Sequence, residues 1–149
     1  EILLSGPDQL PVRILKIDEA KKEILYWAKE PDGAGSVNIV SIESKVRREI
    51  FKSPLIQNEF SVEGFHYQIP SSLDRIFFKA DIDNDSKYEL FVLYFDDRGL
   101  QQISDRFTGY GDITSFSVLD PSTVLFSSKV FDINGVATLQ KMFLWKERP

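Results

Sequence analysis

Short apolar runs separated by turn residues are the feature that most restricts how this chain can fold. Residues 75–80, 90–95 and 123–131 form three such runs, each rich in aromatic and β-branched side chains. Runs of this length, bounded by Gly, Pro, Asn, Asp or Ser, are typical of β-strands. The sequence therefore predicts an all-β protein: an antiparallel meander forming a sandwich, a barrel or a partial propeller-like sheet, with little helix.

Further strands are expected at 11–17, 24–28, 37–42, 46–51, 115–119 and 137–145. Asn134-Gly135 precedes the last of these and is a good hairpin turn. In the first strand, alternation places Val12 and Ile14 inward, and Leu15 and Ile17 less regularly. Residues 43–50 have an alternative, because apolar side chains recur there at four-residue spacing, which also suits a short helix.

A loose internal repeat runs through these strands. Three hairpins have turns that begin at Asp18, Asp81 and Asp132, which are 63 and 51 residues apart. Repeat proteins keep a more constant period, and three units are fewer than the four to eight blades of a closed propeller. We therefore expect residues 1–149 to form a single β domain, with an open fragment of a repeat fold as the alternative.

Composition restricts the class of protein. The chain has 149 residues, of which 42% are hydrophobic, including 12 Phe. One domain with a substantial core is expected at this length. No apolar run approaches the 18 residues of a membrane-spanning helix. The net charge is −5 without a basic cluster, so nucleic acid is excluded as an expected partner.

An acidic stretch between two of the strands indicates a metal site. Asp81, Asp83, Asp85 and Glu89 stand at positions 1, 3, 5 and 9 of one short loop. Alternate residues of a tight loop can direct their oxygens to one centre, and the carbonyl of Lys87 could add another. Ca²⁺ takes six to eight oxygen ligands at roughly 2.3–2.6 Å. The alternative is a solvated acidic turn, because Asp, Asn and Ser are common turn residues.

Strands rather than helices flank this loop, and position 12 is Val92 instead of the Glu that an EF-hand requires. With its flanks the loop resembles the Asp-x-Asp-x-Asp-Gly-x-x-Asp/Glu-Leu loop of FG-GAP and VCBS-type repeats. The resemblance covers residues 77–95, about 20 of 149, and implies a structural Ca²⁺ ion in a β-hairpin. The chain departs from the pattern at Ser86, where Gly is usual because this position often needs a positive φ.

The remaining sequence features concern the location of the protein and the question of catalysis. The chain has no Cys and begins at Glu1, and calcium is plentiful outside the cytosol, so an extracytoplasmic protein (periplasmic, secreted or surface-bound) is expected. His66 is the single histidine, no nucleophile-elbow motif is present, and Gly33-Ala-Gly35 is too short for a dinucleotide fingerprint. We therefore expect no enzyme, although a carboxylate pair for glycoside hydrolysis stays open among 23 acidic residues.

A second loop has the composition of a contact surface. Arg106, Phe107 and Tyr110 stand among glycines, and Arg and Tyr are frequent energetic centres of interfaces. The sequence thus predicts an exported module that binds a protein or glycan and has one calcium-stabilised hairpin. An inhibitor of a secreted hydrolase such as lysozyme, inserting this loop into its target, is the first alternative. A small carbohydrate-active enzyme is the second.

Overall fold

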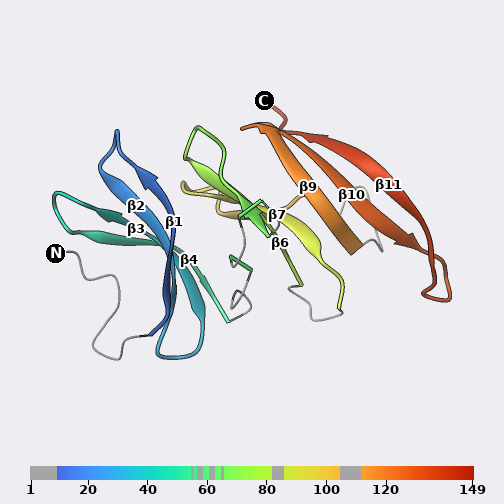
Figure 1. The fold of residues 1–149 in the computed structure, drawn as a ribbon, viewed down its shortest axis with the longest axis horizontal. Helices are drawn as coiled ribbons and strands as arrows, with labels where there is room; N and C mark the ends of the chain where they lie inside the picture. The colour runs from blue at the N-terminus through green and yellow to red at the C-terminus, as the bar shows by residue number, and fades with distance from the viewer. Residues whose placement is uncertain are drawn as a thin grey trace. The chain divides into compact units, whose positions relative to one another are not determined.

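A computed structural model describes residues 10–54, 56, 59–60, 63–64, 66–81, 86–104 and 112–149. The chain divides into two compact units, Glu1–Phe60 and Ser61–Pro149. Every regular element of the described residues is a β-strand, in three antiparallel sheets (Figure 1). The predicted all-β class is therefore confirmed. Whether the two units act as the single expected domain stays a prediction.

The first unit contains one four-stranded meander, here called the first sheet. Its strands are β1 (Val12–Asp18), β2 (Glu23–Lys29), β3 (Gly35–Ser41) and β4 (Arg47–Ser53), hydrogen-bonded in that order. Residues 47–53 are a strand, so the helical alternative for 43–50 is wrong. The inward placement of Ile14 and Ile17 is also wrong, because β1 is the edge strand of its sheet and leaves both isoleucines half exposed. Leu15, at the register shift between Ile14 and Lys16, is buried.

A close backbone approach holds the end of this unit to its sheet. The indole Nε1 of Trp27 donates a buried hydrogen bond of 3.1 Å to the carbonyl of Ile56. Gly35, the first residue of β3, lies against the same carbonyl, where an added Cβ would come within 1.7 Å of the oxygen. Only glycine fits at this position without moving the chain.

The second unit contains two sheets. The second sheet has the order β5-β6-β7-β8, with strands β5 (Tyr67–Gln68), β6 (Arg75–Ala80), β7 (Glu89–Tyr94) and β8 (Leu100–Gln102). The third sheet consists of β9 (Asp112–Asp120), β10 (Thr123–Phe131) and β11 (Ala137–Lys146). The turn predicted at Asn134-Gly135 connects β10 and β11, and Gly135 adopts a φ of 76° there.

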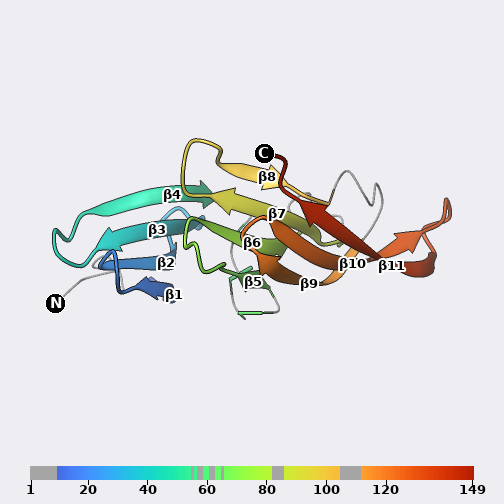
Figure 2. The same cartoon turned by 90° about the horizontal axis from the view of Figure 1, so that it is seen from above.

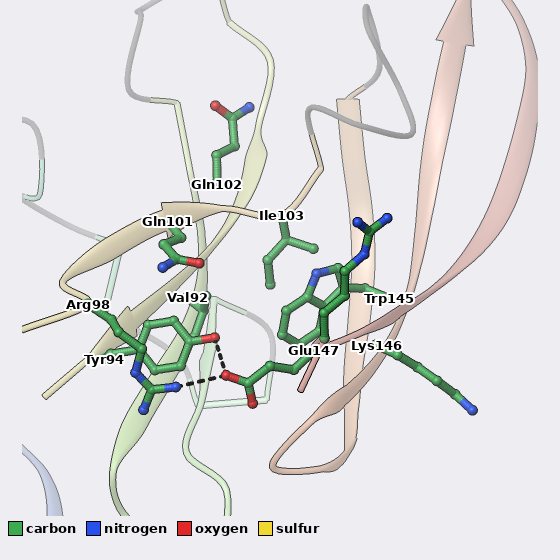
Figure 3. A pocket seen from close by; sticks show the side chains of 10 residues that line it. Val92, Tyr94, Arg98, Gln101, Gln102, Ile103, Trp145, Lys146 and Glu147 are labelled. Carbon is green, nitrogen blue, oxygen red and sulfur yellow. Dashed lines mark hydrogen bonds and ion pairs between the residues drawn. The ribbon is translucent and has the colours of Figure 1, made fainter. Parts of the chain in front are cut away.

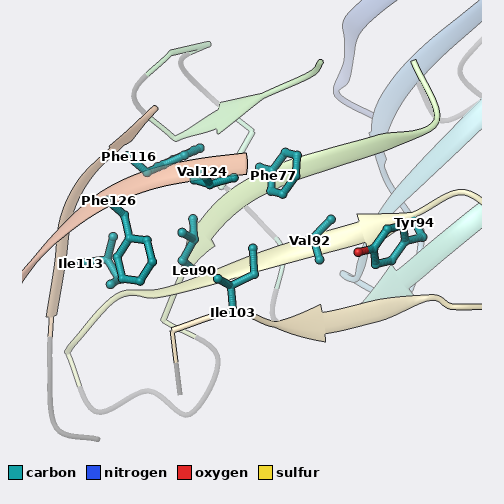
Figure 4. Close-up of a cluster of buried hydrophobic side chains, with 9 residues drawn as sticks. All are labelled: Phe77, Leu90, Val92, Tyr94, Ile103, Ile113, Phe116, Val124 and Phe126. Carbon is teal, nitrogen blue, oxygen red and sulfur yellow. The ribbon is translucent and has the colours of Figure 1, made fainter. Parts of the chain in front are cut away.

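These two sheets share one apolar core (Figure 4). The second sheet and the residue after β8 contribute Phe77, Leu90, Val92, Tyr94 and Ile103, and the third sheet contributes Ile113, Phe116, Val124 and Phe126. The predicted burial of Phe77, Leu90, Val92 and Tyr94 is thus confirmed. The predicted burial of Leu144 is wrong: it is 47% exposed, because its neighbours Phe143 and Trp145 are the residues of β11 that face this core.

Strand β7 is an interior strand of the second sheet and is buried on both faces, as its two apolar faces predict. It lies between β6 and β8, and Phe91 and Leu93 on its second face are as well buried as the core residues on the first. The ring of Phe91 stacks on that of Phe78 with centroids 5.6 Å apart. The acidic loop is therefore attached to the most buried strand pair of this unit.

The meanders repeat with a more regular period than the hairpins chosen from sequence. The second strands of the three sheets, β2, β6 and β10, start at residues 23, 75 and 123, which are 52 and 48 residues apart. The Asp18 hairpin connects the first and second strands of its sheet, whereas the Asp81 and Asp132 hairpins connect the second and third. This difference in position explains the uneven spacing of the three turns.

Candidate functional site

The acidic loop joins β6 to β7 in the second sheet. Asp81 directly follows β6, and Glu89 is the first residue of β7, where it pairs with Ala80. The two ends of the predicted metal loop are therefore brought together by the strand ladder. Asp83 and Asp85 lie outside the described residues, and so the full set of predicted ligands is not part of the described structure.

Position 6 of the loop has the conformation that the pattern requires. Ser86 adopts a φ of 68°, and its backbone N–H donates a 3.0 Å hydrogen bond to Oδ2 of Asp81. A serine held at positive φ costs roughly 1–3 kcal/mol, so the surrounding structure has to impose it. The loop thus makes the sharp turn for which a glycine is usual, and the turn closes on the carboxylate at position 1.

The residues that leave the loop are tied to the third sheet. The N–H of Tyr88 donates to Oδ1 of Asp112 at 2.9 Å, and the carbonyl of Tyr88 accepts from Ile113 at the same distance. The ammonium of Lys87 lies 5.1 Å from the centre of the Phe131 ring. The residues on the exit side of the loop are therefore braced by β9 and β10.

Glu89 and Lys79, in the two strands that flank the loop, carry charged groups that are shielded from solvent. Oε2 of Glu89 is inaccessible to solvent. Lys79 is also buried, with its Nζ 3.3 Å from the carbonyl of Thr114 and 5.4 Å from the centre of the Tyr88 ring. Burial lowers the pKa of Lys79, and the nearby Asp112 acts against this effect.

The described part of the loop fits a hard cation as far as it extends. Its donors are oxygens, and its turn closes on a carboxylate, as a Ca²⁺ loop needs. Within the described residues no group of three or more His, Cys, Asp or Glu side chains is gathered. Asp81 and Glu89 alone supply too few ligands, and the site depends on Asp83 and Asp85.

The predicted contact loop lies outside the described residues, since Arg106, Phe107 and Tyr110 all fall in the segment 105–111. The first described residue after it is Asp112. Its carboxylate accepts from the Tyr88 N–H and lies 4.0 Å from the ammonium of Lys129. Asp112 therefore lies beside the exit of the acidic loop, and the role of Arg106, Phe107 and Tyr110 as a binding surface stays a prediction.

An ion-pair network that sequence reasoning missed joins the second and third sheets at Glu147. This carboxylate accepts hydrogen bonds from Arg75 at 2.6 Å, from the Tyr94 hydroxyl at 2.8 Å and from Arg98 at 2.9 Å. Arg75 also donates twice to Asp74, at 3.0 and 2.8 Å. The partners are up to 72 residues apart in the chain, and no local pattern connects them.

The network changes the acidity of its members. Hydrogen bonds from Arg75 lower the pKa of Asp74 to about 2. Burial, followed by the Glu147 carboxylate, raises the pKa of Tyr94 to about 12. Burial opposes the ionisation of Glu147, but bonds from Arg75 and Tyr94 outweigh it and lower the pKa. Arg98 also pairs with Asp96 at 2.7 Å. Each charged group of the network therefore has a partner of opposite sign, with two arginines facing three carboxylates.

A hollow of about 300 Å³ opens beside this network, between β8 and β11 (Figure 3). Val92, Tyr94, Ile103 and Trp145 form its apolar part. Gln101, Gln102, Arg98, Lys146, Glu147 and Arg148 complete its lining. The hollow thus combines two aromatic rings with two amides, one carboxylate and three cationic side chains, of which Arg98 is already paired with Asp96 and Glu147.

Comparison with known proteins supports the fold and leaves the function open. No family model and no curated protein matches the sequence. The chain is similar to TolB from Acinetobacter baumannii, with a TM-score of 0.52 and 12% identity over 92% of this chain and 30% of that one. The apo structure of the AtxE2 isopeptidase gives a TM-score of 0.48 and 8% identity over 76% of this chain and 20% of the isopeptidase. The chain spans less than a third of either protein, and the TolB similarity shows the fold alone.

Proposed function

We propose that this chain is a binding module of an extracytoplasmic protein, with its β6–β7 hairpin held by a structural Ca²⁺ ion. The conformation of Ser86 carries the proposal. Its positive φ and its hydrogen bond to Asp81 reproduce the sharp turn at position 6 of an oxygen-rich calcium loop. Lys22, Lys45 and Leu73 also adopt a positive φ, so the turn at Ser86 supports a metal loop only in combination with the carboxylate that it closes on and the spacing of the other acidic residues.

The ion would be held by Asp81, Asp83, Asp85 and Glu89, with the carbonyl of Lys87 as a further donor. The ion would neutralise the charge of these carboxylates. Without it, each close pair repels by about 1 kcal/mol in water and about 4 kcal/mol at intermediate dielectric. Because the hairpin is braced against β9, an ion in the loop would rigidify this end of the second unit. A structural ion of this kind needs no open coordination position and takes no part in a reaction.

The partner is proposed to be a protein or a glycan. The FG-GAP and VCBS resemblance supports this class of module, because those repeats use similar loops in surface proteins. Inhibition of a hydrolase depends on Arg106, Phe107 and Tyr110, outside the described residues, and no described contact favours it. Carbohydrate chemistry would need two facing carboxylates in a cleft, and the carboxylate that lines the described hollow, Glu147, is matched by arginines.

Isothermal titration calorimetry on protein stripped with a chelator tests the metal. We expect heat from Ca²⁺ at up to millimolar concentration and little from Mg²⁺, because a flexible all-oxygen loop suits the larger ion. Asp81→Asn should abolish that heat while its side-chain oxygen still accepts the Ser86 N–H. Asp132→Asn is the matched control, since Asp132 closes the β10–β11 turn in a similar way through Asn134 and Val136.

Two results would contradict the calcium proposal. One is an absence of heat with millimolar Ca²⁺ in the unaltered protein. The other is equal binding by the unaltered protein and by Asp81→Asn, because that would place the ion somewhere else. Luminescence of Tb³⁺ in place of Ca²⁺, sensitised by Tyr88 at the loop exit, gives an independent signal of occupancy.

A further inference from the structure

The Asn134-Gly135 pair forms a hairpin turn and also places two groups that can react with each other side by side. The carbonyl of Asp132 accepts a 3.0 Å hydrogen bond from the Gly135 N–H, which closes the turn. Gly135 adopts a φ of 76°, as in hairpin loops that end with a glycine. The side chain of Asn134 is exposed. An accessible side-chain amide therefore precedes a backbone nitrogen that no side chain shields.

Glycine removes the main obstacle to a reaction between such neighbours. The backbone nitrogen after an asparagine can close a five-membered ring on the side-chain carbonyl carbon, Cγ, and a Cβ on the following residue would hinder this approach. The structure describes one other asparagine, Asn38, which is fully buried, precedes Ile39, and bonds through its amide to Ser36 and Arg47. Of the described asparagines, Asn134 alone combines exposure with an unhindered nitrogen.

The tip of this hairpin extends beyond the third strand of its sheet. Pairing of β10 with β9 ends at Lys129, whereas pairing of β10 with β11 continues to Phe131. Figure 2 shows the tip past the end of β9. Ile133 at the tip is fully exposed. Two strands alone are marginally stable in water, and segments with few buried contacts open at a low free-energy cost. The turn around Asn134 therefore opens more readily than the core of this unit.

Asp132 restrains the closed turn through both its side chain and its backbone. Oδ1 of its carboxylate accepts the N–H groups of Asn134 and Val136, both at 2.9 Å. Its carbonyl holds the N–H of Gly135, the nitrogen that has to attack. The nearby carboxylate charge also opposes the loss of a proton from that nitrogen, because like charges disfavour a second ionisation. The closed turn is thus protected, and a reaction has to start from the open one.

We propose that Asn134 is a site of spontaneous deamidation and that Asp132 sets its rate. In the open turn the Gly135 nitrogen gives its proton to hydroxide and attacks Cγ of Asn134. A bond forms between these two atoms, the bond from Cγ to the side-chain nitrogen breaks, and that nitrogen takes a proton from water and leaves as ammonia. Water then opens the cyclic imide at either carbonyl, which leaves aspartate or isoaspartate at position 134. The reaction needs no oxidant, reductant or cofactor.

The product changes the surface at the tip of the hairpin. Isoaspartate lengthens the backbone by one carbon, so the N–H groups that follow it can no longer all reach Asp132. Both products add a negative charge close to the Asp132 carboxylate, and the two charges repel. The turn lines a hollow of about 440 Å³ together with Lys87 and Phe131. Deamidation therefore alters the surface beside the exit of the acidic loop and leaves the apolar core unchanged.

Peptide mass spectrometry of the aged protein tests the proposal. The folded protein is incubated in mildly alkaline buffer and digested, and fragmentation of the peptide that contains residue 134 distinguishes asparagine, aspartate and isoaspartate. We expect conversion at Asn134 and none at Asn38, and faster conversion when urea keeps the turn open. Asn134→Gln should give no product over the same period, because its longer side chain would have to close a six-membered ring.

Variants of Asp132 test its control of the rate. Asp132→Ala removes two backbone hydrogen bonds, a loss comparable with that of a helix-capping side chain, so conversion and hydrogen exchange at the Gly135 amide should both become about tenfold faster. Asp132→Asn keeps an acceptor oxygen without the charge and should fall between the two rates. Asp120→Ala is the matched control, because Asp120 accepts the Ser122 N–H in the β9–β10 turn, and it should leave the rate unchanged.

Three results would overturn the proposal. The first is an Asn134 that stays intact in the folded protein over a period in which the protein in urea converts. The second is conversion at other asparagines only. The third is an Asp132→Ala variant that converts no faster than the unaltered protein, because the turn then does not control the reaction. None of these results bears on the calcium loop, so the proposed function is tested separately.

Discussion

Replacing Gly35 with alanine is expected to destabilise the first unit strongly. The new Cβ would lie 1.7 Å from the carbonyl oxygen of Ile56 and 2.6 Å from Nε1 of Trp27. Neither atom is the end of a flexible chain, because the first is backbone and the second belongs to a buried ring. Both atoms belong to the buried hydrogen bond of 3.1 Å between Trp27 and Ile56.

The size of the effect follows from these contacts. Overpacking of a tight site costs about 1–3 kcal/mol. Separating a buried donor from its acceptor costs about 1–3 kcal/mol more. Alanine returns about 0.4–1 kcal/mol by restricting the unfolded chain. The net loss in the free energy of unfolding is therefore about 3 kcal/mol. For a chain of this length, that corresponds to a fall of about 6–12 °C in the melting temperature.

Urea denaturation followed by tryptophan fluorescence measures this loss, because Trp27 is one of the two tryptophans and lies at the altered contact. Gly33→Ala is the matched control. Gly33 has a φ of 86° with no atom within 4 Å of an added Cβ, so its replacement costs about 1–2 kcal/mol through backbone strain alone. If Gly35→Ala is no more destabilising than Gly33→Ala, the close approach to Ile56 does not exist in solution.

Three further predictions concern charge and metal. The pKa of buried Lys79 is lowered, so between that pKa and 10.5 the unfolded state binds more protons than the folded state. The free energy of unfolding should therefore rise with pH towards 10.5. Lys79→Met should remove part of this rise, measured as the urea midpoint at each pH. Since the pKa of Asp74 is lowered to about 2, its contribution should be complete above pH 3.8 and disappear as pH falls through about 2, and Asp74→Asn should flatten acid denaturation curves over that range. A chelator should lower the melting temperature by several degrees, since Ca²⁺ at a hundredfold excess over its dissociation constant stabilises by about 2.7 kcal/mol. Far-ultraviolet circular dichroism should stay β-like, because the core around Phe77 does not depend on the loop; complete unfolding would show that the core is weaker than its burial indicates.

The features that the sequence predicted correctly are those with a local cause. Residues 75–80 and 123–131 are strands β6 and β10 with the expected bounds, because their β-branched and aromatic side chains favour extended backbone over the whole run. The two apolar faces of β7 predicted its central position, because a strand that is apolar on both faces has to be covered on both. The resemblance to the FG-GAP and VCBS-type loop implied a positive φ at Ser86, because Gly is usual at this position of that loop, and Ser86 adopts a φ of 68°.

The predictions of burial that were wrong have a different cause, because they depend on how one strand is placed against its neighbour. The β-bulge in β1 falls at Leu15, which is buried while Ile14 is exposed, and Leu144 pairs with Leu125 on the face opposite Phe143. Strand β8 has the polar sequence Leu-Gln-Gln, which is a strand only because it pairs with β7. A shift of one residue in register exchanges the two faces of a strand, and the pattern of a single strand cannot report such a shift.

The amino-acid sequence by itself determined that this protein is all-β, where most of its strands lie, and which acidic residues share a loop. Only the tertiary structure decided that Glu147 joins Arg75, Tyr94 and Arg98, and that Gly35 lies against Ile56. Strand formation depends on neighbours a few residues away in the chain. Ion pairs and close approaches depend on contacts between segments as far as 72 residues apart, which only the folded chain brings together.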